Sequence, residues 1–175
     1  VESNSVMLRA MARRLGCEAQ RVPPVKDDFA SISAAVREGL ESEAHVVIIC
    51  AGSSAGSKDF TRRIIEAEGE VLVHGVAAMP GKPSLLGIAR GKLVVGAPGY
   101  PVSAVVCFEE LVAKILAWLG RFEAPRRPRE DILINRKSPS KLGVEEFLRV
   151  AVGRVGEDYV ATPLGRGAGN ITTMC

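Results

Sequence analysis

Residues 45–61 read HVVIICAGSSAGSKDFT. An apolar run of strand length comes first, a turn of small residues follows, and the segment after Asp59 has helical character. Small residues let a backbone approach a ligand closely, and the free N–H groups at the start of a helix attract anions. The order of strand, glycine-rich turn and helix therefore predicts an α/β protein with an anion site at this turn.

A second stretch, residues 92–104, repeats the pattern as KLVVGAPGYPVSA. Pro101 suits the first position of a helix, which we expect to run to Leu119 and to be stopped by Gly120. That helix would be apolar on more than one side, which favours self-association. In open α/β sheets ligands bind beyond the carboxyl ends of the strands, where both turns would lie. The two turns together predict one pocket for a phosphorylated or oxyanionic ligand.

Apolar periodicity and capping residues outline the other elements before residue 121. Helical spacing predicts a first helix capped by Ser3 and stopped by Gly16, and a second helix capped by Asp27 or Asp28. We also expect strands at 19–22, 45–50, 70–77, 84–88 and 92–95, a helix at 60–68, and a tight turn at Arg90-Gly91. Continuous apolar strands that alternate with helices predict a three-layer α/β/α sandwich around a largely parallel sheet.

The pattern changes after an arginine-rich connector. Short alternating segments follow at 131–135, 144–155 and 159–162, with a turn at 156–158 and no helical run. We therefore expect an α/β domain over residues 1–121, a linker over 122–130 and a small β domain over 131–175. Because the chain starts at Val1 and ends soon after a glycine-rich stretch, we expect a piece of a longer polypeptide with a truncated β domain.

Composition narrows the class of protein. The 175 residues carry a formal net charge of +3 and are 47% hydrophobic, which suits a soluble domain with a substantial core. No apolar run reaches the roughly 20 residues that span a membrane, and the sequence shows no basic-then-apolar leader. We expect a cytoplasmic protein without membrane contact. The connector arginines lack neighbouring stacking aromatics, so we favour a solvated linker over an RNA-binding arm and expect no nucleic-acid partner.

The four cysteines and two histidines are too scattered for a zinc or iron–sulfur site. Cys50 ends an apolar strand and Cys107 lies in an apolar helix, so we expect buried, inert thiols. His45 and His74 both fall on strand-like runs, which disfavours a Ser-His-Asp or Cys-His nucleophile.

Four residues in and between the two turns are candidates for chemistry. Asp59 either caps its helix or holds a divalent cation or positions a nucleophilic oxygen. Lys82 stands on a stiff Pro-Gly-Lys-Pro turn, where it either neutralises an oxyanion or is a surface lysine. Ser103 either donates to an anion or caps the second helix, and Tyr100 could stack on a planar ligand or cover the pocket.

Four motifs stand in a fixed order along the chain: SNS at 3–5, GSSAGSKDF at 52–60, PGKP at 80–83 and GAPGYPVSA at 96–104. In this order they resemble the molybdopterin molybdotransferases, of the MoeA and gephyrin E-domain type. The resemblance covers essentially the whole chain and corresponds to the C-terminal half of a typical member. It implies that two N-terminal domains of the family are absent from this chain.

The resemblance implies a molybdopterin-binding domain of MogA-like fold, a homodimer, and a reaction in which adenylated molybdopterin is hydrolysed and molybdate is inserted with the help of Mg²⁺. It implies that Asp59 is the essential carboxylate and the metal ligand, and that Lys82 is the anion-binding lysine of the catalytic site. The cofactor-binding residues that it implies are Gly52, Ser53, Ser54, Gly56, Ser57, Pro98, Gly99, Tyr100, Pro101, Ser103 and Arg149.

Three positions depart from the family's usual pattern. Met79 stands where a lysine is usual, Ser57 where an acidic residue is common, and Tyr100 where an asparagine is usual. Losing a cation weakens the attraction for an oxyanion by about 1 kcal/mol in a pocket of low dielectric constant. The departures favour an alternative, a non-catalytic sensor module for molybdopterin or molybdate within a larger regulator. The related adenylyltransferase is disfavoured because it usually lacks a β appendage, and the choice between molybdate and tungstate stays open.

Overall fold

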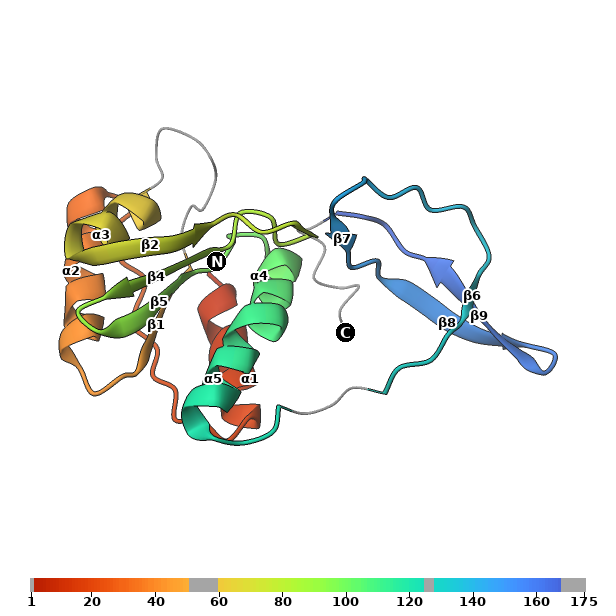
Figure 1. Ribbon diagram of the computed structural model, residues 1–175, viewed down its shortest axis with the longest axis horizontal. Helices are drawn as coiled ribbons and strands as arrows, with labels where there is room; N and C mark the ends of the chain where they lie inside the picture. Colours follow the sequence, from red (N-terminus) through yellow and green to blue (C-terminus); the bar gives the residue numbers. More distant parts are fainter. Residues whose placement is uncertain (1, 51–59, 125–127, 168–175) are drawn as a thin grey trace.

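A computed structural model describes residues 2–50, 60–124 and 128–167 of the chain. Its helical segments are α1 (Asn4–Arg14), α2 (Phe29–Glu41), α3 (Phe60–Glu68), α4 (Pro101–Cys107), the π-helical turn η1 (Phe108–Val112) and α5 (Ala113–Gly120). Its strands are β1 (Val46–Ile49), β2 (Gly69–His74), β3 (Ala78–Met79), β4 (Leu85–Ala89), β5 (Lys92–Gly96), β6 (Leu133–Ile134), β7 (Glu145–Glu146), β8 (Val150–Val155) and β9 (Asp158–Pro163). Figure 1 shows an α/β sandwich with the β module, residues 128–167, beside it.

The main sheet has the strand order β1-β5-β4-β2. Strands β1 and β5 are parallel, whereas β4 runs antiparallel to both of its neighbours, β5 and β2. The prediction of a largely parallel sheet is therefore wrong. The reason is the turn at Arg90-Gly91, whose φ angles of 48° and 75° form the two-residue connection that only antiparallel neighbours can share.

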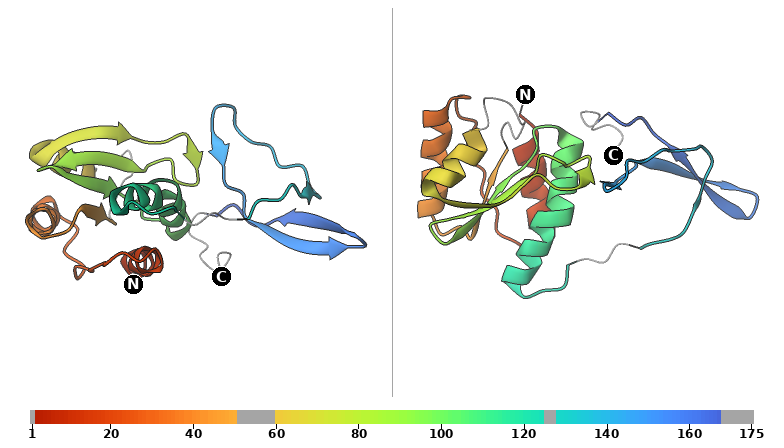
Figure 2. Two further views of the ribbon diagram at one scale, coloured as in Figure 1. Left: turned by 60° about the horizontal axis from the view of Figure 1, so that its bottom comes forward. Right: turned by 45° about the horizontal axis from the view of Figure 1, so that its top comes forward.

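Helices cover both faces of this sheet, which confirms the three-layer sandwich. Helices α2 and α3 pack on one face through a cluster that includes Val36, Leu40 and Ile64. Helix α1 and the continuous helix α4–η1–α5 pack on the other face, where Leu8 and Phe108 are buried. Figure 2 shows the two helical layers on opposite sides of the strands. The central strand β5, which is covered on both faces, accounts for the apolar run at its positions, whereas most residues of the edge strand β2 are exposed.

The helix ends follow local signals in most cases. Asp28, rather than Asp27, caps α2, since its carboxylate accepts a hydrogen bond from the Ser31 N–H at 2.8 Å. Ser3 occupies the capping position of α1, but its side chain makes no capping bond. The Glu2 carboxylate instead accepts from the Ser5 N–H at 2.8 Å. Local spacing thus finds where a helix starts more reliably than which side chain caps it.

The long helix differs in detail from its prediction. It begins at Pro101 as expected and passes through the η1 turn before ending at Gly120, one residue beyond the expected Leu119. Arg121, with a φ of 52°, adopts the left-handed conformation that ends the helix. Among the described residues, no helix has the length and apolar character needed to cross a membrane.

Residues 19–22 do not form the predicted strand. Side chains of α1 contact this segment instead: Arg9 donates to the Ala19 carbonyl at 3.2 Å, and Arg21 donates to the Ser5 hydroxyl at 2.6 Å. Strand β1, the nearest strand along the chain, pairs only with β5 in the described sheet. Residues 19–22 therefore do not form a strand in the absence of a neighbouring strand.

In the β module, the predicted segment 144–155 divides into β7 and β8, which belong to different sheets. Strands β8 and β9 form the expected hairpin, turning at Gly156 with a φ of 65°. Strand β6 pairs with β9, whereas β7 pairs with β3, which precedes β4 of the main sheet. The β module is thereby connected to the sandwich by a short parallel ladder.

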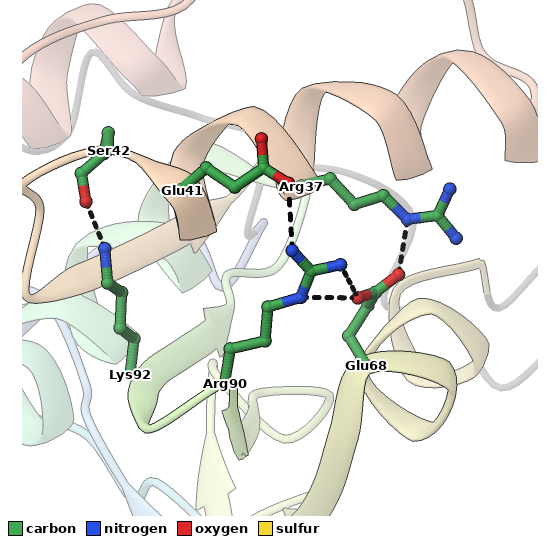
Figure 3. A network of polar contacts seen from close by, with 6 residues as sticks. All are labelled: Arg37, Glu41, Ser42, Glu68, Arg90 and Lys92. Carbon is green, nitrogen blue, oxygen red and sulfur yellow. Dashed lines mark hydrogen bonds and ion pairs between the residues drawn. The ribbon is translucent and has the colours of Figure 1, made fainter.

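A charged network fixes the end of the sheet at the β4–β5 turn (Figure 3). Glu68, the last residue of α3, accepts hydrogen bonds from Arg37 of α2 and from Nε of Arg90 in the turn, the second at 2.9 Å. Nη1 of Arg90 also reaches Glu41 of α2 at 3.0 Å. Hydrogen bonds from the two guanidinium groups hold the pKa of the Glu68 carboxyl below its usual range. The network joins α2, α3 and the hairpin.

Candidate functional site

The register of the sheet brings three of the sequence motifs to one edge. Ile49, the last residue of β1, lies opposite Gly96, the last residue of β5. Gly96 in turn lies opposite Leu85, the first residue of β4. The first glycine-rich turn follows β1, the second follows β5, and the PGKP turn precedes β4. All three therefore leave the sheet at the same edge, as expected for a ligand site in an α/β fold.

The first glycine-rich turn lies outside the described residues. This applies to the predicted site residues Gly52, Ser53, Ser54, Gly56, Ser57 and Asp59. The elements on either side of the turn are described. Thr61, in the first turn of α3, is buried and packs so closely on the end of β5 that a Cβ at Gly96 would be 2.9 Å from its Cγ2. Helix α3 therefore starts over the edge where the second turn begins.

The start of the second glycine-rich turn is fixed by a backbone hydrogen bond to β1 and by the burial of Pro98. The Ala97 N–H donates to the Ile49 carbonyl at 2.9 Å, which extends the β1–β5 ladder into the turn. Pro98 is fully buried, whereas Tyr100 is 66% exposed. Tyr100 is thus available for the predicted stacking on a planar ligand, which stays a prediction.

Asn4 is a residue that sequence reasoning missed. It is buried in the first turn of α1, and its side-chain Nδ2 donates to the Gly99 carbonyl at 2.8 Å. This bond joins the SNS motif to the second glycine-rich turn across 95 positions. The motif was noticed in the sequence, but only the fold brings the two motifs together.

The start of α4 corrects one interpretation of Ser103. Tyr100 occupies the capping position, without a side-chain capping bond, and Ser103 is a buried residue inside the helix. Ser103 is therefore not the helix cap. The first helical hydrogen bond runs from the Ala104 N–H to the Tyr100 carbonyl at 2.9 Å. The N–H groups that precede it in a helix lack intrahelical partners, so those of residues 102 and 103 are suited to an anion.

Lys82 is the exposed residue of a turn whose backbone is fixed by hydrogen bonds. The Val76 N–H donates to the Lys82 carbonyl at 2.8 Å, and the Ser84 N–H and hydroxyl donate to the Gly81 carbonyl at 2.9 and 2.7 Å. The Lys82 side chain is exposed and forms no hydrogen bond or ion pair with another described residue. A fixed backbone with a free ammonium group suits an anion-binding lysine.

Arg149 makes its described side-chain contacts inside the β module. Its Nη2 donates to the carbonyls of Gly165 and Gly167 at 2.7 and 3.1 Å, and its own carbonyl accepts from the Leu164 N–H. These bonds connect the start of β8 to the segment after β9. The predicted role of Arg149 in ligand binding stays a prediction.

Cys107 is buried, as expected, whereas Cys50 is only partly buried. Burial raises the pKa of the Cys50 thiol to about 12 and also raises that of Cys107. Cys17, Cys50 and Cys107 are free. His45 and His74 are exposed residues at opposite ends of two different strands. Within residues 2–50, 60–124 and 128–167, no group of three or more His, Cys, Asp or Glu residues could hold a metal ion.

The chain is similar in sequence to proteins of molybdopterin metabolism. Residues 1–118 match the family model described as "Probable molybdopterin binding domain". A molybdopterin biosynthesis protein from Methanocaldococcus jannaschii is 34% identical over 152 residues, which are 87% of this chain and 36% of that protein. A molybdopterin molybdenumtransferase from Haemophilus influenzae is 30% identical over 149 residues, which are 85% of this chain and 37% of that protein.

Two solved structures of proteins of molybdopterin or molybdenum cofactor biosynthesis are similar to this chain as well. The molybdopterin biosynthesis MoeA protein from Pyrococcus horikosii has a TM-score of 0.75 and 33% identity, over 97% of this chain and 40% of that chain. A molybdenum cofactor biosynthesis protein from Pyrococcus furiosus has a TM-score of 0.70 and 26% identity, over 99% of this chain and 55% of that chain. The chain thus spans little more than a third of the length of the curated relatives it matches.

Proposed function

The chain belongs to the MoeA-like family of molybdenum cofactor biosynthesis, and on that premise we propose that it takes part in the insertion of molybdate into adenylated molybdopterin. The observation that supports this step is that the strand ends next to the three motifs, at Ile49, Gly96 and Leu85, lie together at one edge of the sheet. Such an edge gathers backbone N–H groups and an ammonium group where a phosphorylated pterin needs them.

Each described residue of the edge has a part in this proposal. The ammonium group of Lys82 balances the negative charge that grows on phosphate when water cleaves the phosphoanhydride and AMP leaves. The N–H groups of residues 102 and 103 bind the phosphate that remains on the pterin. Asn4 fixes the second glycine-rich turn, and the exposed ring of Tyr100 covers the pterin. The two dithiolene sulfurs of molybdopterin then form bonds to the molybdenum of molybdate, and the oxygen that they displace leaves with the two thiol protons as water.

Magnesium is part of the proposal only through Asp59. Oxygen ligands such as carboxylates are those that Mg²⁺ prefers, and the ion would supply positive charge at the phosphate oxygens. The described residues alone hold no metal-ligand group, so a metal would depend on Asp59, which lies outside them. No step of the proposal is assigned to the ion.

We also keep the predictions of a homodimer in the cytoplasm, without nucleic-acid partners, and of a division into residues 1–121, 122–130 and 131–175. Most of the apolar residues of the long helix, such as Val102 and Phe108, are buried within the chain and are not available for a dimer. At the end of that helix Trp118 is 76% exposed and Leu119 is 38% exposed. These two residues are the part of the helix that supports self-association.

Complementation tests the proposal against the sensor alternative. The full-length protein is expected to rescue a strain that lacks its molybdotransferase, and Asp59→Ala and Lys82→Ala variants are expected to rescue it poorly. Lys92→Ala is the matched control, because Lys92 bonds to the Ser42 carbonyl at the opposite end of the sheet. Binding of molybdopterin without any rescue would instead support a sensor. The names of the relatives do not favour that alternative.

A further inference from the structure

The β module is joined to the sandwich at the strand that leads into the Lys82 turn. Strand β3 pairs with β7, and in the described part of the chain this is the one strand pairing between the two parts. The Glu145 N–H donates to the Ala77 carbonyl, and the Phe147 N–H donates to the Met79 carbonyl, both at 2.8 Å. The PGKP turn begins at the next residue. A displacement of β7 would therefore reach the turn directly through the backbone.

The base of the same loop belongs to the sandwich, because the loop leaves β2 after His74 and enters β4 at Leu85. The Val76 N–H bonds to the Lys82 carbonyl at 2.8 Å, and the Gly75 N–H bonds to the Ser84 carbonyl at 2.9 Å. These bonds close a narrow loop that contains β3, and Ser84 at its base is fully buried. With the base of the loop in the sandwich and β3 paired to β7, the position of Lys82 depends on both parts of the chain.

A cavity of about 310 Å³ lies where the loop, the long helix and β7 meet. Gly81 lines it from the turn, Val106 from α4 and Phe147 from the β module. Gly81 is buried and has a φ of 122°, and a Cβ at this position would be 3.4 Å from Val106. The turn is thus packed against α4, and the half-buried Phe147 forms another wall of the same cavity. Removing the Phe147 ring would enlarge this cavity beside the turn.

Strand β7 is itself tied to the rest of the β module. Glu146 of β7 forms an ion pair with Arg166, with Nε and Oε1 3.4 Å apart. Arg166 also donates through Nη2 to the Ser138 hydroxyl at 2.7 Å and to the Pro139 carbonyl at 2.9 Å. The β module therefore presents Phe147 from a braced strand.

We propose that Phe147 is a positioning residue for Lys82: by forming the β-module wall of the cavity behind the PGKP turn, it sets the place from which the Lys82 ammonium group meets an anionic ligand. This inference rests on the proposed function, since molybdopterin is the ligand that Lys82 would meet. It makes the β module a working part of the anion site.

A double-mutant cycle on the full chain tests the inference, with molybdopterin binding followed by pterin fluorescence. Phe147→Ala is expected to weaken binding roughly fivefold when Lys82 is present and to have no further effect in a Lys82→Ala background. Phe147→Leu, which rebuilds most of this wall, is expected to keep most of the affinity. Phe122→Ala removes another half-buried phenylalanine, at the end of α5, and is expected to leave the affinity unchanged.

The outcomes separate the inference from the proposed function. Equal weakening by Phe147→Ala in both backgrounds, with the wild-type chain binding normally, would overturn the role of Phe147 alone. No binding by the wild-type chain would overturn the proposed function and the inference together. If Phe147→Ala does not fold in a thermal melt, Phe147→Val takes its place in the cycle. A Phe147→Val variant with wild-type affinity would also overturn the inference.

Discussion

Single residues at the end of β5 determine how closely the elements around the site approach one another. At Gly96 a Cβ would be 2.9 Å from Cγ2 of Thr61 and 3.0 Å from Cβ of Leu85. Both neighbours are almost completely buried, so neither can move away without disturbing the core. Gly96 thus allows α3, β4 and β5 to pack closely, in addition to any access that it gives to a ligand.

We expect Gly96→Ala to lower the free energy of unfolding by about 1–3 kcal/mol, because it overpacks this contact. Chemical denaturation of the wild-type and variant chains measures the difference. Gly153→Ala in β8 is the control, since a Cβ there meets no atom within 4 Å. A Gly96→Ala variant as stable as the control would show that the contact between α3 and β5 is looser than described.

Asn4 offers a second prediction at this scale. Asn4→Ala leaves the Gly99 carbonyl without its donor and is expected to cost about 1–3 kcal/mol of unfolding free energy. Asn135→Ala removes a similar bond, to the Thr162 hydroxyl at 2.7 Å, but an exposed one, and is expected to cost less than 1 kcal/mol. Thermal melts of the two variants compare them. Similar losses of stability in both variants would mean that the burial of Asn4 does not increase the contribution of its hydrogen bond.

At the scale of elements, local signals predicted much of the fold. Helix α3 has the predicted bounds, and the Arg90-Gly91 turn forms the predicted hairpin. Strand 19–22 was wrong because a strand needs a neighbour, which no local pattern supplies. The antiparallel direction of β4 was not predicted, although the two-residue hairpin at Arg90-Gly91 requires it, because the alternation of strands and helices elsewhere indicated a parallel sheet. The role of Asn4 depends on a contact 95 positions away, which spacing cannot reveal.

The network around Glu68 gives the pH prediction for this scale. Hydrogen bonds from Arg37 and Arg90 lower the pKa of Glu68 in the folded chain. The stability they add is therefore present above the pKa of about 4.5 that the group has when unfolded, and it is lost as the pH falls through the lower folded value. We expect the stability difference between the wild-type chain and Glu68→Gln to shrink from pH 7 to pH 3.

Denaturation curves across this pH range measure that difference. Glu66→Gln, on the same helix, is the control because the ion pair of Glu66 with another described residue is an exposed i,i+4 contact with Arg62 at 2.7 Å. Its stability difference from the wild-type chain is expected to be small at every pH. A difference for Glu68→Gln that stays constant as the pH falls would show that the carboxylate gains nothing from the two arginines.

At the scale of the whole molecule, the proposed site depends on the register of the sheet, which aligns the strand ends next to the motifs. The sequence predicted the PGKP turn and the second glycine-rich turn as parts of a site, and the register places both at the edge where β1 ends. Whether Asp59 joins them stays a prediction, because residues 51–59 lie outside the described part of the chain. The coupling of the β module to the Lys82 turn through β3 and β7 was not predicted, since it pairs segments from two expected domains.

Amide NMR of the full chain during titration with molybdopterin tests most directly whether the three motifs form one site. We predict the largest shifts at Cys50 and at the non-proline residues of 81–84 and 97–103, which surround the carboxyl ends of β1 and β5. Ser42 and residues 90–92, at the opposite edge of the sheet, are expected to stay unchanged. Largest shifts at that opposite edge, or shifts confined to the β module, would contradict a single site at the shared edge.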